Sequence, residues 1–256
     1  MMRFAAAAVL CSVGVTSARA QGALYGVATF SSFGTQSLYS IDTVTGSATL
    51  IGDTGLRRVA GLDWDHVNNR LVALNGAGDQ FSVNTHTGAT TLIVDANFGI
   101  PEGSIAFENG TAYTTVFDNL SAWNGGGWQQ IGPSMLAGGA DISGLDFGGG
   151  MLLGLATFGS DADQLVAYDI ISGSATTIGT TGTNAVSVAG LAHAFLGGEW
   201  YMSDGASLYS LNTTTGSASL IGAHGLSGFS GLAFVPAPGA AVLLGLGGLA
   251  VARRRR

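Results

Sequence analysis

Three aspartates occupy related positions in the sequence and are the residues best placed to do chemistry. Asp63 and Asp146 each follow a Gly-Leu pair, in AGLDWD and SGLDFG, and Asp65 lies two residues after Asp63. Carboxylates that converge from such positions are typical ligands of Ca²⁺. The equivalent positions of other copies hold Ala106, Ala192 and Ala233. Because the pattern is incomplete, solvated or turn-bonding aspartates are the simpler interpretation.

Other motifs that usually carry catalysis are missing from the sequence. It holds no HExxH, GxSxG or P-loop, and its four histidines fall at different phases of the repeats described below. The four tryptophans are candidate sugar-stacking platforms, although packing between structural units is the commoner use of such residues. These are Trp64, Trp123, Trp128 and Trp200. The sequence therefore predicts no catalytic residue, cofactor or metal, with convergence of groups from separate repeats as the alternative.

A hairpin-like segment recurs along the chain. LYSIDTVTGSATLIG at 38–52 returns at 80–94, 165–179 and 208–222, and a degenerate copy spans 120–132. The alternating run Leu-Tyr-Ser-Ile-Asp is typical of a half-buried strand, and the Thr-Gly that follows supplies a turn. A second apolar run completes each hairpin.

Two further strands precede each hairpin from the second copy onward, such as AGLDWD and RLVALNG. Four strands per unit of roughly 40 to 46 residues are typical of propeller blades. SGLAFV at 230–235 has no hairpin after it, whereas the first hairpin lacks a leading strand. The sequence thus predicts an all-β fold, a propeller of five four-stranded blades closed by pairing of 230–235 with the N-terminal blade. Six blades are the nearest alternative.

Composition fits an acidic, exported body. Of 256 residues, 42 are glycine and 10% are charged, and lysine is absent. Between the two ends only three arginines, Arg57, Arg58 and Arg70, stand against all sixteen acidic residues. A surface this acidic repels phosphate backbones, so nucleic-acid binding is excluded.

The N-terminal residues 1–20 fit a secretory signal peptide. Arg3 supplies the positive charge, an apolar run follows, and Ala18 and Ala20 form a small-x-small cleavage site before Gln21. This predicts export through the Sec-type machinery. Cys11 lies inside this segment, so the mature chain would hold no cysteine.

The C-terminal segment has three parts: Val235-Pro236-Ala237-Pro238, an apolar run, and the arginines Arg253, Arg254, Arg255 and Arg256. The arginine cluster is typical of a stop-transfer signal that faces the cytoplasm. The segment resembles the PEP-CTERM sorting signal of bacterial exported proteins, which typically carries Val-Pro-Glu-Pro. The resemblance implies an inner-membrane anchor, processing by an exosortase-type enzyme and a link to extracellular polysaccharide. Ala237 stands where Glu is usual, which leaves open whether the chain is processed or only anchored.

These features divide the chain into a signal peptide (1–20), a propeller domain (21–235) and a sorting tail (236–256) with a short transmembrane helix. Short helices are expected at both ends. We expect an exported, non-catalytic interaction scaffold, held in the inner membrane facing outward or displayed on the surface or in the matrix. The alternatives are a lyase or hydrolase acting on polysaccharide in a central funnel, and an extracytoplasmic ligand-binding sensor. Carboxylates with raised pKa in the funnel would favour the enzyme.

Overall fold

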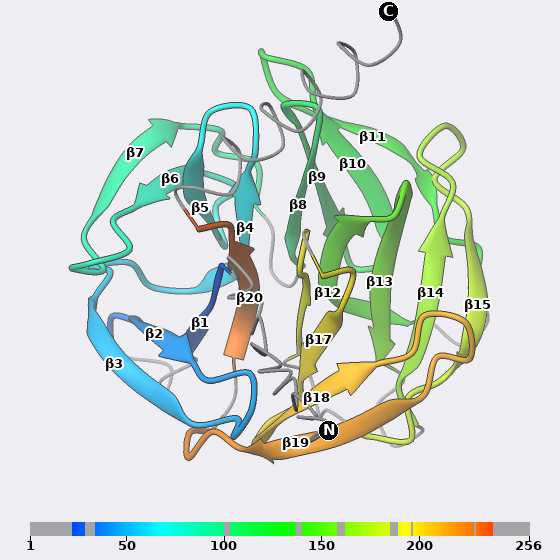
Figure 1. Ribbon diagram of the computed structural model, residues 1–256. Helices are drawn as coiled ribbons and strands as arrows, with labels where there is room; N and C mark the ends of the chain where they lie inside the picture. Colours follow the sequence, from blue (N-terminus) through cyan, green and yellow to red (C-terminus); the bar gives the residue numbers. More distant parts are fainter. Residues whose placement is uncertain are drawn as a thin grey trace, which may run out of the picture.

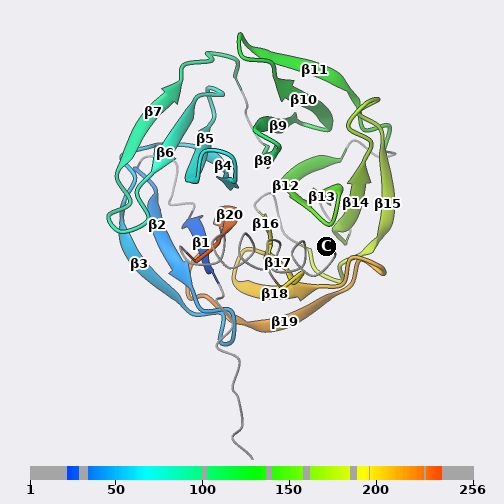
Figure 2. The same cartoon turned by 45° about the horizontal axis from the view of Figure 1, so that its top comes forward.

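Five four-stranded antiparallel sheets surround a common centre in the computed structural model (Figures 1 and 2), which confirms the predicted five-bladed β-propeller. The structure describes residues 22–28, 34–99, 103–136, 140–157, 162–184, 189–195, 197–227 and 229–237. None of the described residues forms a helix long and apolar enough to cross a membrane. The expected terminal helices lie outside the described residues.

The strands are given blade by blade, from the inner strand to the outer one. Blade 1 contains β20 (Phe229–Val235), β1 (Ala23–Ala28), β2 (Ser37–Ile41) and β3 (Ala48–Asp53). Blade 2 contains β4 (Val59–Asp65), β5 (Arg70–Asn75), β6 (Gln80–Val83) and β7 (Thr90–Val94). Blade 3 contains β8 (Ile105–Glu108), β9 (Thr111–Val116), β10 (Asn119–Trp123) and β11 (Trp128–Pro133). Blade 4 contains β12 (Asp141–Gly148), β13 (Met151–Thr157), β14 (Gln164–Tyr168) and β15 (Ala175–Thr180). Blade 5 contains β16 (Gly190–His193), β17 (Trp200–Ser203), β18 (Ser207–Leu211) and β19 (Ala218–Ala223).

Blade 1 joins the two ends of the chain, as the sequence predicts. β20 pairs antiparallel with β1, in a register that runs from Ala23↔Val235 to Ala28↔Phe229. The domain therefore closes as a ring, with β20 also lying against its neighbours β4 and β16. Because β1 begins where β20 ends, both chain ends leave from one side of the ring, which we call the terminal face. Following the alternating strands, the β9–β10 turn lies on the opposite side, the distal face, and Ser134 after β11 is hydrogen-bonded to Asp118 in this turn.

An Asp or Asn fixes the turn of every outer hairpin. The Asp42 carboxylate accepts hydrogen bonds from the backbone N–H of Val44 at 2.7 Å and of Thr45 at 2.9 Å. Equivalent side-chain oxygens accept from the second residue onward at Asn84, Asn124, Asp169 and Asn212. These Asx turns are the physical reason for the recurring Asp/Asn-x-x-x-Gly pattern, since the side chain replaces a backbone turn contact.

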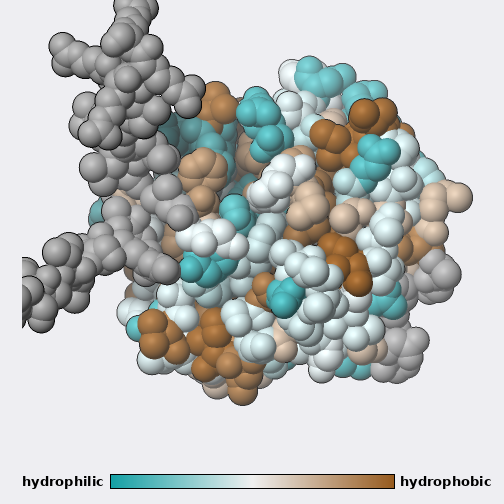
Figure 3. Space-filling view, turned by 45° about the vertical axis from the view of Figure 1, so that its right-hand side comes forward, coloured by the Kyte–Doolittle hydropathy of each residue, from teal (hydrophilic) through white to brown (hydrophobic). Residues whose placement is uncertain are grey.

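Every outermost strand carries a bulge, and the bulged residue is always isoleucine. In blade 1, Leu38 pairs with Gly52 and Tyr39 pairs with Leu50, which leaves Ile51 as the extra residue. The same register shift falls at Ile93, Ile131, Ile178 and Ile221. A bulge twists an edge strand away from further pairing. It also turns Leu50 outward, and such apolar residues form small separate groups in the view of Figure 3.

Glycines set the spacing between neighbouring blades at the outer rim. The space for a side chain on Gly52 of β3 is filled by the backbone carbonyl oxygen of Thr87, in the outer hairpin of blade 2. Gly88 in that hairpin has φ +77°, and a Cβ there would lie 2.7 Å from the Gly52 carbonyl oxygen. The same pairing of glycines joins three other blade boundaries: Gly222 with Gly46, Gly132 with Gly173, and Gly179 with Gly216.

The boundary between blades 2 and 3 differs from these four, because Val94 occupies the position of the strand glycine. Here the indole Nε1–H of Trp128 donates a hydrogen bond of 2.9 Å to the carbonyl oxygen of Gly78. Trp128 is buried beside Leu74 and Phe107 in the core between the two blades. A buried aromatic with a satisfied polar atom thus replaces the close backbone contact.

Candidate functional site at the ring centre

Asp63 and Asp146 form the candidate site, and each joins its own inner strand to that of the next blade. Asp63 Oδ1 accepts the N–H of Trp64 at 2.6 Å, and its Oδ2 accepts the N–H of Phe107 in β8 at 2.7 Å. Asp146 does the same with Phe147 at 2.6 Å and with His193 in β16 at 2.5 Å. We call these two carboxyl groups the interblade latches. They satisfy backbone donors on inner strand edges that have no further strand to pair with.

Burial sets the electrostatics of the two latches. Both residues are 5% exposed. Desolvation raises the pKa of Asp63 well above its ordinary value, with a further contribution from the charge of Asp146. Desolvation likewise raises the pKa of Asp146 to about 8, against the opposing effect of the His193 and Phe147 N–H donors. The strands β4 and β12 approach each other across the ring, so two negative charges are unfavourable there.

We predict that the folded protein loses stability between pH 7 and pH 9. The Asp146 carboxyl keeps its proton up to about pH 8 when folded, whereas it titrates near 3.8 when unfolded. The folded state therefore binds more protons in this window, and the free energy of unfolding falls as the pH rises, by about 1.4 kcal/mol for a group with this folded pKa. Melting temperatures across the window measure the slope, which Asp146→Asn should reduce.

The range from pH 7 to pH 9 lies above the pH at which the histidines change charge, and their effect on the free energy of unfolding has the opposite sign. Burial lowers the pKa of His66, His193 and His224 below 6.5. The unfolded state then binds more protons below pH 6.5, so their contribution to stability rises with pH and ends near neutrality. A wild-type slope that is flat or positive above pH 7 would contradict neutral latches.

Aromatic and histidine side chains lie near the ring centre at the terminal face. The rings of His66 and Phe195 are 5.0 Å apart, and those of His193 and Trp200 are 4.7 Å apart. The charge of His66 contributes to lowering the pKa of His193, so the two imidazoles are near each other although they come from blades 2 and 5. The sequence offered no sign of this proximity because the histidines lie at different phases of their repeats.

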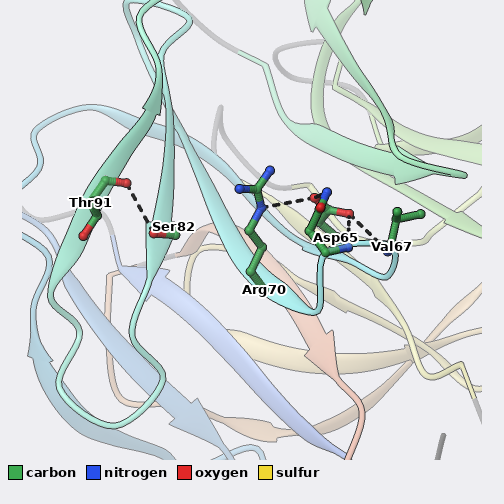
Figure 4. Close-up of polar contacts among 6 residues, drawn as sticks. Asp65, Val67, Arg70, Ser82 and Thr91 are labelled. Carbon is green, nitrogen blue, oxygen red and sulfur yellow. Dashed lines mark hydrogen bonds and ion pairs between the residues drawn. The ribbon is translucent and has the colours of Figure 1, made fainter. Parts of the chain in front are cut away.

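Asp65 bonds to residues of its own hairpin (Figure 4). Its Oδ1 accepts the N–H of Val67 at 3.2 Å, and its Oδ2 lies 3.2 Å from Arg70 Nε. In the same blade, Ser82 Oγ donates to the carbonyl oxygen of Thr91 at 3.4 Å. Asp65 therefore has a structural use that fits the turn-bonding interpretation. Within the described ranges, no three or more His, Cys, Asp or Glu side chains gather as a metal site.

All four tryptophans take part in packing. Trp128 and Trp200 are buried, and Trp123 meets Trp128 edge to face with centroids 5.6 Å apart. Buried rings offer no open face for a sugar. Trp64 packs against the core between blades 1 and 2 and stays partly exposed.

The predicted sorting residues lie mostly outside the described residues. Val235 ends β20, paired with Ala23, and Pro236 and Ala237 follow it. Pro238, the arginines Arg253 to Arg256, and the cleavage-site residues Ala18, Ala20 and Gln21 lie beyond the described ranges. The predicted sorting motif therefore begins at the last residue of β20.

Comparisons with known proteins support the fold. No protein-family model matches the chain. No curated protein matches it either. A chain in the structure titled "Crystal structure of Nidogen/Laminin Complex" is similar with a TM-score of 0.55 and 12% sequence identity, covering 84% of this chain and 99% of that one. That chain is a β-propeller, so the shared feature is the β-propeller architecture.

Proposed function

We propose that this protein is an exported, non-catalytic interaction scaffold, tethered through its C-terminal segment and presenting the propeller to partners. The observation that carries the proposal is the pairing of Ala23 with Val235. Because this pairing brings both ends of the propeller to one face, a leader and an anchor would attach on the same side. The rim and the distal face then stay accessible, and closed rings commonly bind partners through loops on one face.

The hydrogen bonds of the two interblade latches also favour a non-catalytic scaffold over an enzyme. A catalytic carboxyl must present an oxygen to the reacting group. In both Asp63 and Asp146, each oxygen instead accepts a backbone N–H. The raised pKa values follow from burial, and the carboxyl groups stabilise the contacts between blades.

Fractionation of cells that produce the full chain tests the export and tether. Mass spectrometry of the mature protein should find Gln21 as its first residue. Deleting Arg253 to Arg256 should move the protein out of the membrane fraction, because the stop-transfer charge is lost. Replacing the same four arginines by lysine keeps the charge and is the matched control. An intact Met1, or unchanged fractionation of the deletion, would contradict the proposal.

A polysaccharide-active enzyme is the second candidate, and the pKa of Asp146 near 8 is the observation that favours it. The mature chain should be incubated with a panel of neutral and acidic polysaccharides, and new reducing ends or unsaturated products should be measured. A non-catalytic scaffold should give no such products. If the wild type turns over a polysaccharide and Asp146→Asn abolishes this turnover while keeping the fold, the protein is an enzyme and the scaffold proposal is wrong.

A further inference from the structure

Two large apolar residues stand exposed on the distal face with a left-handed backbone. Phe117, in the β9–β10 turn, has φ +56° and is 52% exposed. Met135, in the loop after β11, has φ +62° and is 76% exposed. Bulky side chains rarely adopt this conformation, and glycine or asparagine is the ordinary choice. Elsewhere on the described surface, positive φ falls mainly on glycine and on Asn69, Asn97 and Asn109.

A network of hydrogen bonds around Asp118 holds the two residues together. The Asp118 carbonyl oxygen accepts the N–H of Ser134 at 3.2 Å, and its Oδ2 accepts the Ser134 hydroxyl at 2.8 Å. Since Phe117 precedes Asp118 and Met135 follows Ser134, both side chains project from one joined support. Tyr168 of blade 4 donates to the same carbonyl oxygen at 3.2 Å. The support is therefore fixed to two blades.

The charged side chains that flank Phe117 and Met135 are acidic. Asp118 and Asp141 flank the apolar pair, and both are partly exposed. All the basic residues in the described part of the chain lie within 57–70, in blade 2 and the loop before it. An apolar centre with an acidic rim is complementary to an apolar side chain flanked by lysine or arginine. The β9–β10 turn that carries Phe117 lies on the side opposite to the one where both chain ends leave, so a tethered chain keeps it accessible.

We propose that Phe117 and Met135 are the anchors of a docking surface for a protein segment that carries an aromatic or aliphatic residue between basic ones. The inference rests on the proposed scaffold function and names its surface and partner class. Backbone strain at exposed apolar residues is typical of residues kept for binding. Aliphatic Met135 beside acidic groups suits a basic peptide better than a neutral or acidic polysaccharide.

Selection from a phage-displayed library of random linear peptides on the mature chain tests the surface. Selected peptides should carry aromatic or aliphatic residues next to Lys or Arg. Calorimetry should show the affinity of a selected peptide falling about tenfold or more in the Phe117→Gly/Met135→Gly double variant. The melting temperature of this variant should be unchanged or higher, because glycine accepts positive φ without strain.

Val44→Ser is the matched control, since Val44 is 82% exposed on the outer hairpin of blade 1, which contacts blade 5 and not blades 3 or 4. It should leave peptide affinity unchanged. Peptides that lack basic residues, or that bind the double variant as tightly as the wild type, would overturn the docking surface. If the chain is exported and retained in the membrane but selects no such peptides, the docking surface is wrong and the proposed scaffold function stands. If the chain fails the fractionation test, the proposed scaffold function is wrong, whatever the peptide selection shows.

Discussion

A chain that ends at Ser227 is expected to lose its cooperative thermal transition, whereas a chain that ends at Ala237 keeps it. The shorter chain lacks β20, which pairs with β1 along its whole length. Phe229, Leu232 and Phe234 are buried there. Full burial of each such side chain stabilises a protein by about 1.5–3 kcal/mol, and total stability is only about 5–15 kcal/mol. Circular dichroism on heating measures the transition.

A circular permutant separates the lost strand from the lost chain order. Because Ala23 and Val235 are paired neighbours, a short linker can place Phe229–Val235 ahead of Gly22. The permutant retains every strand of blade 1 and should melt cooperatively, at a temperature much closer to that of the wild type than the truncation. If the chain ending at Ser227 melted like the one ending at Ala237, ring closure would not stabilise the domain.

Gly52→Ala has the second largest expected effect. Its new methyl group would overlap the carbonyl oxygen of Thr87, which belongs to backbone and cannot rotate away. Blades 1 and 2 would have to separate locally, so we expect the free energy of unfolding to fall by about 2–4 kcal/mol. Chemical denaturation measures this change through a lower midpoint.

Gly34→Ala is the control for this substitution. A Cβ on Gly34 meets nothing within 4 Å, and its φ lies outside the left-handed region. Its denaturation midpoint should therefore match that of the wild type or exceed it slightly, since alanine restricts the unfolded chain. Equal midpoints for Gly52→Ala and the wild type would show that the blades tolerate wider spacing at the rim.

The sequence predicted the blades because each strand carries its own signal. Alternation in 38–41 and the Thr-Gly turn after it depend on neighbouring residues alone. The unpaired segment 230–235 even predicted closure. The bulge at Ile51 was not predictable in this way, because an isoleucine inside Ala-Thr-Leu-Ile-Gly looks like any other strand residue. Its identity as the extra residue depends on the register with β2.

The candidate site was only partly predictable. Asp63 and Asp146 occupy the same position of their repeats, and this shared position correctly grouped them as one pair of candidate residues. Their partners, the N–H groups of Phe107 and His193, are backbone atoms of other blades and leave no mark in side-chain sequence. Phe117 was equally hidden, because only its φ distinguishes it from an ordinary strand-end aromatic.

The direction of β20 also has a mechanical consequence for a tethered chain. Val235 is both the last residue of the ring-closing strand and the residue nearest to the tail. A partner pulling from the distal face would load β20 along its length. Its contacts with β1 from Ala23 to Ala28 would then resist in shear, all at once. A pull across the strand would instead break them one by one, so the ring is built to bear tension along its axis.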